Sequence, residues 1–254
     1  MGAGKPTFLR ALLLPALLGA IVIGGARFDA WSPDAWTRPR GDHTLTERLG
    51  RHGPAVQARL AGVFASAGLN YPPAELLYVA FKQERRLEVY ARGTTNAPWR
   101  HVSVYPILAL SGTLGPKLRQ GDRQVPEGFY RVESLNPDSR FHLSMRLDYP
   151  NAFDRDMARL DRREHLGSDI MIHGGAASIG CLALGDQAAE DLFVLAALAT
   201  DSRVRVLISP LDFRDWGAGW QAPHGPAWLE RLYAGIRSEL AGLPKPAASA
   251  RIMQ

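Results

Sequence analysis

Hydrophobic positions along the chain follow two spacings, and the change from one to the other divides the chain into regions. Residues 54–67 place apolar side chains three or four positions apart, which predicts one face of a helix that ends at Gly68. From Leu76 onward the apolar residues form short runs rich in β-branched and aromatic side chains, separated by turn residues. These runs predict strands over 76–82, 86–91, 101–110, 128–132, 141–145, 169–173 and 203–208.

Helical spacing returns in the last third of the chain. Asp186 is a typical helix-capping residue, and apolar positions between 189 and 199 share one face of the helix that would follow it. A second helix is predicted from Pro226, a favourable residue in a first turn, to Leu240, and the residues after 243 read as a loose tail. The chain is therefore predicted to be mainly β with peripheral helices.

The first 27 residues follow neither pattern. Lys5 and Arg10 precede 16 uncharged, mostly apolar residues at 11–26, and Arg27 closes the run. A basic start and an apolar run shorter than the roughly 20 residues of a membrane-spanning helix are typical of a secretory signal peptide. An uncleaved signal anchor is the alternative. Both predict that the rest of the chain lies outside the cytoplasm and meets a membrane only through residues 1–26.

These patterns give a plan of the domains. Residues 1–27 are the signal peptide or signal anchor, 28–75 a linker and helical extension, 76–210 the strand-rich domain, and 211–254 the C-terminal helix and tail. The 254 residues are 46% hydrophobic and 22% charged, as in an ordinary globular protein. The 30 basic residues behind the net charge of +5 are scattered, so solvated surface arginines explain the charge better than nucleic-acid binding.

The chain has one cysteine, Cys181, at the end of a glycine-rich loop that begins at His173. In an exported protein a single cysteine has no intramolecular disulfide partner. A nearby imidazole can take the proton of a thiol and so activate it as a nucleophile. Gly180 offers a backbone N–H for an oxyanion hole together with that of Cys181, and Ser178 can order the loop or position a substrate. The helix expected after Asp186 would lower the pKa of the thiol.

Two other interpretations of Cys181 remain open from spacing alone. A cysteine beside a glycine is often a small buried apolar residue, and this explains the spacing about as well as catalysis does. Zinc needs three or four ligands, and no second Cys or His lies at ligand spacing, so the sequence predicts neither a metal nor any other cofactor.

Several segments together resemble one known family. Segment 173–181 begins with His-Gly and ends with Ser-Ile-Gly-Cys, which resembles the active-site signature of the L,D-transpeptidase catalytic domain, the YkuD-type fold. Segment 121–130 is similar to the family's Thr-Pro-x-Gly-x-Phe/Tyr block, with Val125 where threonine is common. Segments 114–119 and 149–155 resemble the narrower YafK-like branch of the family.

The resemblance implies a mixed β-sandwich or barrel-like catalytic domain with N- and C-terminal helical extensions, working in the periplasm on peptidoglycan stem peptides. Cys181 would attack the carbonyl of meso-diaminopimelate to form a thioester, with His173 as general base and then general acid. An amine acceptor gives transpeptidation, and water gives hydrolysis. In the YafK-like branch hydrolysis releases a lipoprotein bound to peptidoglycan, so such a lipoprotein is a second expected partner. The expected substrate-binding residues are Tyr149, Asn151, Asp154, Lys117 and Arg119, and the alternative for each is a structural or surface role.

Two departures from the family pattern leave the acyl acceptor open. Many members have histidine at the position of Ile179, and arginine or asparagine at the position of Ala183. A different kind of function also remains, namely a non-catalytic peptidoglycan-binding scaffold on a degenerate version of the fold. The intact residues of segment 173–181 favour the enzyme.

Overall fold

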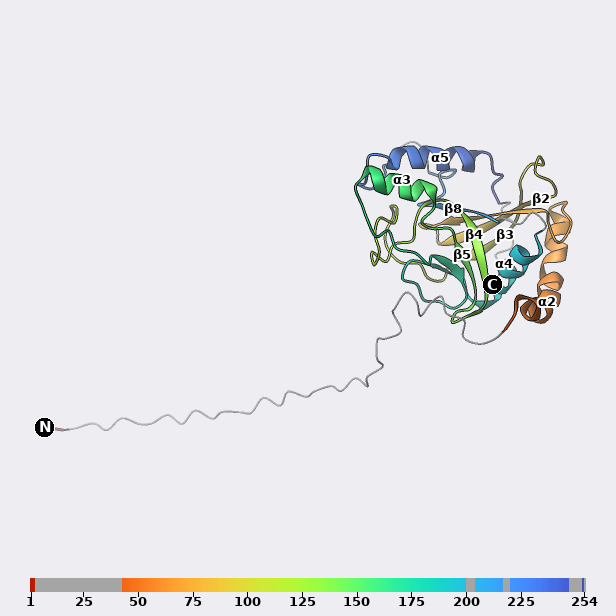
Figure 1. Ribbon diagram of the computed structural model, residues 1–254, viewed down its shortest axis with the longest axis horizontal. Helices are drawn as coiled ribbons and strands as arrows, with labels where there is room; N and C mark the ends of the chain where they lie inside the picture. Colours follow the sequence, from red (N-terminus) through yellow and green to blue (C-terminus); the bar gives the residue numbers. More distant parts are fainter. Residues whose placement is uncertain (3–42, 200–203, 217–219, 247–252, 254) are drawn as a thin grey trace. The chain divides into compact units, whose positions relative to one another are not determined.

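The computed structural model describes residues 1–2, 43–199, 204–216, 220–246 and 253 (Figure 1). Residues 3–27 of the predicted signal segment and residues 28–42 of the predicted linker and helical extension lie outside this part of the chain, so both stay predictions. Among the helices of the described residues, none combines the length and the apolar character that crossing a membrane requires.

The strands of the described residues form a mixed sheet in the order β3-β2-β1-β8-β4-β5-β6-β7. Strand β4 belongs to both halves of the sheet, because its first residues pair with β8 and its later residues pair with β5. The pairs β1–β8 and β6–β7 are parallel, and the others are antiparallel. The prediction of a mixed β fold with helices is confirmed. The strands are β1 Glu75–Phe81, β2 Arg86–Arg92, β3 Arg100–Pro106, β4 Gly128–Ser139, β5 His142–Leu147, β6 Met171–His173, β7 Leu182–Ala183 and β8 Arg205–Ser209, and the helices are α2 Leu45–Ser66, α3 Ala152–Leu160, α4 Asp186–Leu198 and α5 Leu229–Ala241.

Strand β1 is buried on both faces, which explains its uninterrupted apolar run. Alternate side chains of a strand point to opposite faces. Tyr78 and its neighbours on one face pack in the core that includes α2 and α4, whereas Val79 and its neighbours on the other face pack against α5. The α5 layer and the α2–α4 layer therefore cover opposite faces of this part of the sheet (Figure 1).

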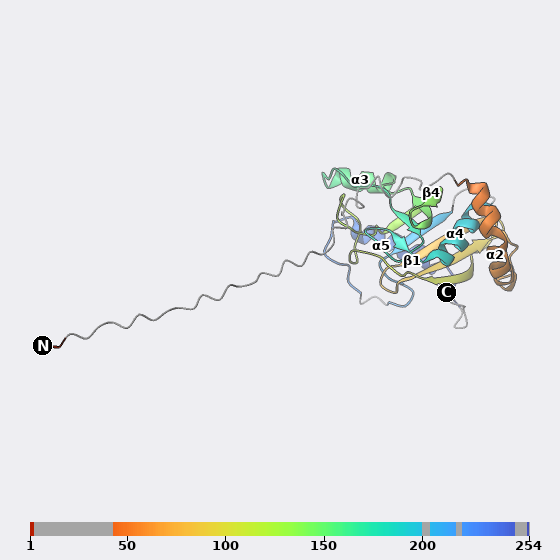
Figure 2. The same ribbon diagram turned by 90° about the horizontal axis from the view of Figure 1, so that it is seen from below.

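Helix α2 packs against α4, and α4 packs against β5 (Figure 2). Val56, Leu60 and Phe64 recur at helical spacing on α2 and are fully buried in the shared core. The hydroxyl of Tyr78 on β1 donates to the carbonyl of Leu192 on α4 at 2.8 Å, which fixes the sheet to this layer. The first predicted helix is thus part of the core.

Several elements differ from the sequence prediction. Helix α2 begins at Leu45 and not at residue 54, because Thr44 and Glu47 form a capping box ahead of it. Strand β4 continues to Ser139, beyond the predicted end at 132. Helix α3 and the two-residue strand β7 were not predicted, and both border the segments that resemble the family.

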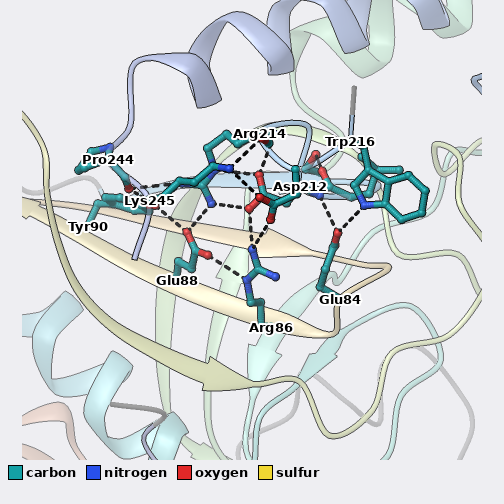
Figure 3. Close-up of polar contacts among 12 residues, drawn as sticks. Glu84, Arg86, Glu88, Tyr90, Asp212, Arg214, Trp216, Pro244 and Lys245 are labelled. Atoms are coloured by element: carbon teal, nitrogen blue, oxygen red, sulfur yellow. Dashed lines mark hydrogen bonds and ion pairs between the residues drawn. The ribbon is translucent and has the colours of Figure 1, made fainter. Parts of the chain in front are cut away.

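A buried ionic network joins β2 to the segment that follows β8 (Figure 3). Arg214 donates to Glu88 at 2.8 Å and to Asp212 at 2.7 Å, and Arg86 bridges the same two carboxylates at 2.9 and 2.5 Å. The hydroxyl of Tyr90 donates to Glu88 at 2.6 Å. Each buried charge in the network has a partner of opposite sign, and the contacts link β2 to the segment after β8.

Candidate active site

The parallel pairing of β6 and β7 brings the two ends of segment 173–181 side by side. His173 ends β6 and pairs with Ala183 on β7, and Cys181 lies two positions before Ala183. Cys181 directly precedes β7, so the parallel pairing of β6 and β7 places its backbone near that of His173. Both side chains are buried, with Cys181 at 4% exposure and His173 at 0%. The topology thus brings the two predicted residues into one region of the fold, and their roles as nucleophile and base stay predictions.

The loop between them is held by its own hydrogen bonds. The hydroxyl of Ser178 donates to the carbonyl of Cys181 at 2.7 Å, and its oxygen accepts the N–H groups of Gly180 and Cys181 at 3.2 and 3.1 Å. Gly180 has φ of +137°, a region that favours glycine. The Ser178 hydroxyl therefore organises the backbone on both sides of the thiol.

The predicted oxyanion donors are the same two N–H groups that contact Ser178. An oxyanion at Cys181 would have to displace the hydroxyl from at least one of them, so this role of Gly180 stays a prediction. The start of the loop is fixed separately, because the N–H of Gly175 donates to Asp186 Oδ1 at 2.8 Å. Asp186 is the first residue of α4, and Gly185 occupies the cap position that the sequence assigned to Asp186.

The hydrogen bond of His173 defines its tautomer. Its Nδ1 lies 2.6 Å from the carbonyl oxygen of Gly174. A carbonyl only accepts, so Nδ1 carries the proton and Nε2 is the basic nitrogen. The ring of Phe141 packs on the imidazole with centroids 4.6 Å apart. Burial lowers the pKa of His173, against a smaller opposing effect of the Gly174 hydrogen bond, so the ring is neutral at pH 7.

Burial also decides the state of the thiol. Desolvation raises the pKa of Cys181 from an ordinary 9.0 to about 11, and the N–H of Met171 and the charge of Lys117 only partly offset it. The sulfur donates to the carbonyl of Asp169 at 3.6 Å. The prediction of a lowered thiol pKa is therefore wrong for this structure. The carboxylate of Asp186 sits in the first turn of α4, where it also offsets the positive end of that helix.

Among the predicted substrate-binding residues, Lys117 is tied electrostatically to the thiol. Its buried ammonium donates to the carbonyl of Arg119 at 3.0 Å and to Asp122 at 2.5 Å. Asp122 also accepts backbone N–H groups within the same turn, which keeps its pKa low against the effect of burial. The ammonium of Lys117 thus stabilises the turn that contains Arg119 and Asp122. The side chain of Arg119 is exposed.

The other three predicted substrate-binding residues hold α3 and its surroundings. Asn151 caps α3 and forms a capping box with Asp154. Tyr149 is 2% exposed, and its hydroxyl donates to the carbonyl of Leu166 at 3.1 Å. Burial raises the pKa of Asp154 to about 6, although hydrogen bonds from Asn151 and Tyr130 oppose the shift. These contacts are the structural alternative named above, and a role in substrate binding stays a prediction.

A buried ion pair that sequence reasoning missed supports the same region. Lys82 at the end of β1 donates to Glu127 at 2.8 Å and to the carbonyls of Gly115 and Val125 at 2.9 and 3.0 Å. The hydroxyl of Tyr233 on α5 donates to the second oxygen of Glu127 at 2.6 Å. The only signal in the sequence was a lysine that ends an apolar run. The pair joins β1, the 111–127 loop and α5.

Ala183, one of the two departures from the family pattern described above, is part of the sheet. Ala183 is fully buried and exchanges backbone hydrogen bonds with Ala109, at 3.0 and 3.2 Å. Ile179 is partly exposed on the loop. Neither position offers a charged group to a substrate.

With this geometry in place, comparisons with known proteins identify the class. The L,D-transpeptidase catalytic domain, YkuD, matches residues 76–208, which is more than half of the chain. The chain therefore belongs to the L,D-transpeptidase catalytic domain family. It is 39% identical to the YafK protein of Escherichia coli (strain K12) over 140 residues, which are 53% of this chain and 54% of YafK. The chain thus spans about half the length of the curated relatives it matches.

Solved structures of related proteins give weaker matches. The helical cell shape determining protein Pgp2 from Campylobacter jejuni is 23% identical with a TM-score of 0.41, covering 54% of this chain and 48% of Pgp2. Bd1075 from Bdellovibrio bacteriovorus is 22% identical with a TM-score of 0.38, and the match covers 54% of this chain and 49% of Bd1075. The L,D-transpeptidase from Xylanimonas cellulosilytica DSM 15894 is 15% identical with a TM-score of 0.34, and the match covers 54% of this chain and 61% of the transpeptidase chain.

Proposed function

We propose that this protein is a cysteine acyltransferase or hydrolase that acts on peptidoglycan stem peptides in the periplasm. The observation that carries the proposal is the parallel β6–β7 pairing, which brings the backbone of Cys181 near that of His173, with both side chains buried. Membership of the L,D-transpeptidase family supports the substrate class. The export segment at residues 1–26 remains part of the proposal.

The reaction has two steps. In the first, Nε2 of His173 takes the thiol proton while Cys181 Sγ adds to the carbonyl of the third stem residue, meso-diaminopimelate. The intermediate collapses, His173 gives its proton to the leaving amine, and a thioester remains on Cys181. In the second step an amine or water attacks the thioester, its proton passes to His173, and the released thiolate takes that proton back.

The protonation states decide how the first step starts. The raised pKa of Cys181 and the lowered pKa of His173 make the resting pair a neutral thiol and a neutral imidazole. Proton transfer therefore accompanies the attack on the carbonyl, because a separated thiolate and imidazolium would both be buried charges. His173 already presents the correct tautomer for this transfer.

Hydrolysis and transpeptidation share the thioester and differ in the acceptor. Release of a lipoprotein from peptidoglycan, which the resemblance to the YafK-like branch implies, is one form of the proposed hydrolysis. The alternative is a non-catalytic peptidoglycan-binding scaffold, which would also have a buried, protonated thiol. Turnover therefore separates these functions, and binding to peptidoglycan does not.

The experiment compares the wild type, Cys181→Ala and His173→Gln on purified sacculi with and without bound lipoprotein. We expect the wild type to change the muropeptide masses, and a mass increase on the intact protein to report the thioester. A new cross-link, an exchanged terminal residue and a released protein identify the three possible acceptors. Cys181→Ala should abolish both signals. Wild-type protein that binds sacculi but changes no product would establish the scaffold.

A further inference from the structure

Two histidines and a glutamate from three different elements meet at the junction of α2, β5 and α4. His142 Nε2 lies 2.9 Å from Glu190 Oε1, and His52 Nδ1 lies 3.1 Å from the same oxygen. The two imidazole rings contact edge to face with centroids 5.3 Å apart. One potential ligand atom from each residue lies within 4.8 Å of the others. Family membership assigns no role to this group, and His52 lies outside the matched residues 76–208.

The two imidazoles and the carboxylate are the kinds of group that bind a zinc ion. Two imidazole nitrogens and one carboxylate are typical zinc ligands, and sites with three protein ligands take a water as the fourth. Ligand atoms about 2.0–2.2 Å from a tetrahedral zinc lie roughly 3.3–3.6 Å from one another. The two His–Glu190 distances, 2.9 and 3.1 Å, are slightly shorter than that spacing, and the two imidazole ligand atoms lie within 4.8 Å of each other. We propose that His52, His142 and Glu190 form a zinc site that joins α2 to the catalytic domain.

The state of His52 fits this role. The residue is 8% exposed, and its Nε2 has no hydrogen-bond partner among the described residues. Because Nδ1 faces Glu190 Oε1, a cation bound through Nδ1 would leave the ring proton on Nε2, where no other group in the described part of the chain competes for it. The side chains of His142 and Glu190 are 27% and 19% exposed, which allows an ion and its water ligand to enter.

The neighbouring cations do not occupy the cluster. Arg59 donates at 2.6 and 2.9 Å to Asp191, and its contact with the outer oxygen of Glu190 is longer, at 3.5 Å. Arg48 pairs with Asp138 at 3.5 Å. The oxygen of Glu190 that faces the histidines therefore remains available to a cation.

The location gives the ion a positioning role for the active site. His142 follows Phe141, whose ring packs on His173. A side-chain carbon at Gly174 would lie 3.1 Å from the β-carbon of His142, so the cluster lies directly behind the start of the catalytic loop. An ion held there would fix β5 and Phe141, and through them the imidazole of His173. It would take no part in the acyl transfer itself.

The test measures zinc binding directly, which keeps it independent of the proposed acyl transfer. Full-length protein carrying Cys181→Ala is purified without an affinity tag, so that neither the thiol nor a tag competes for metal. After treatment with a chelator it is titrated with zinc by calorimetry, and with cobalt as a spectroscopic probe of tetrahedral coordination. We expect one site per chain and a melting temperature that rises with zinc.

Conservative variants show whether the three residues form the site. His52→Gln, His142→Asn and Glu190→Gln keep the size or the backbone preference, since asparagine tolerates the φ of +70° at His142. Loss of residues that merely support metal ligands costs about 10–100-fold in affinity, so loss of a ligand should cost at least as much. His165→Gln, an exposed histidine elsewhere, is the matched control and should bind zinc as before.

A measurement without ligand variants keeps the proposal testable if those variants fold poorly. Side-chain nitrogen spectra of the chain without these substitutions should show zinc-dependent shifts for His52 and His142 and none for His165. No zinc binding at micromolar concentrations, or shifts confined to other histidines, would overturn the proposal and leave the cluster as a hydrogen-bonded ion network.

Discussion

Alkylation of Cys181 as a function of pH tests the state of the catalytic pair. Desolvation raises the thiol pKa from an ordinary 9.0 to about 11. Because the pKa is higher by about 2, the thiolate fraction near neutral pH is ~100-fold lower than that of a free thiol. Steric protection slows iodoacetamide by a constant factor, so the shape of the pH profile is the informative quantity. Between pH 7 and 10 the logarithm of the rate should rise by about one per pH unit without a plateau.

The same shift makes a prediction for stability. The thiol is held protonated in the folded protein, so its contribution is complete below the unfolded pKa of about 9 and is lost as pH rises through about 11. The total effect is about 3 kcal/mol above pH 11, of which about 1.4 kcal/mol is already lost at pH 10, and it should be absent in Cys181→Ala. Denaturant unfolding of the two proteins at pH 8 and pH 10 isolates it, because other groups that titrate in this range are common to both.

Two controls for the alkylation profile separate the electrostatic cause of a slow reaction from other effects. The chain unfolded in urea should reach a rate plateau above pH 9, as an ordinary thiol does. His173→Gln should leave the slope unchanged, because a neutral imidazole contributes no charge to be removed. A wild-type plateau below pH 9 that disappears in His173→Gln would refute the reasoning, because it would mean a preformed thiolate–imidazolium pair.

Three further substitutions test contacts around the site. Lys82→Met should destabilise the fold by about 3–5 kcal/mol in denaturant unfolding, because it leaves Glu127 buried without its partner; a double variant with Glu127→Gln that recovers nothing would contradict this. Ser178→Ala should lower turnover on sacculi and cost about 1–3 kcal/mol, since the N–H groups beside the thiol lose their acceptor; unchanged turnover would show that the hydroxyl is dispensable. Asn151→Asp keeps the oxygen that caps α3 but loses the amide donor to the carbonyl of Phe129 at 2.7 Å, so stability should fall by about 0.5–1.5 kcal/mol; a large rise in KM in protein that stays folded would assign Asn151 to substrate binding.

The sequence located the elements whose signal is local. The β1 and β2 runs were apolar enough to predict, and the strand–loop–cysteine segment indicated both catalytic candidates. Strand β7 has two residues and forms only because β6 lies beside it, so no local pattern could reveal it. Helix α3 begins with a capping box at Asn151 and Asp154, which was interpreted only as a motif of possible substrate contacts.

Burial explains why the predicted lowering of the Cys181 thiol pKa is wrong. The glycine-rich loop and the following helix suggested a lowered thiol pKa, because both are visible in the chain. The desolvation that raises it comes from packing and has no local signature. The sequence argument against a metal covers only ligands that lie at close spacing along the chain. His52, His142 and Glu190 come from three elements, which only the folded chain brings together.

The segments outside residues 76–208 reach the catalytic pair through short chains of contacts. From the C-terminal side, Tyr233 on α5 bonds Glu127, whose loop meets Gly180 through the carbonyl of Gln124, 3.5 Å from where a side-chain carbon of Gly180 would lie. From the N-terminal side, His52 on α2 contacts the Glu190–His142 pair next to the ring that packs on His173. Helix α5 also covers one face of β1. The two helices are therefore structural parts of the same unit as the family domain, and a fragment cut to the family boundaries would lose contacts that support the proposed base, His173, and the proposed nucleophile, Cys181.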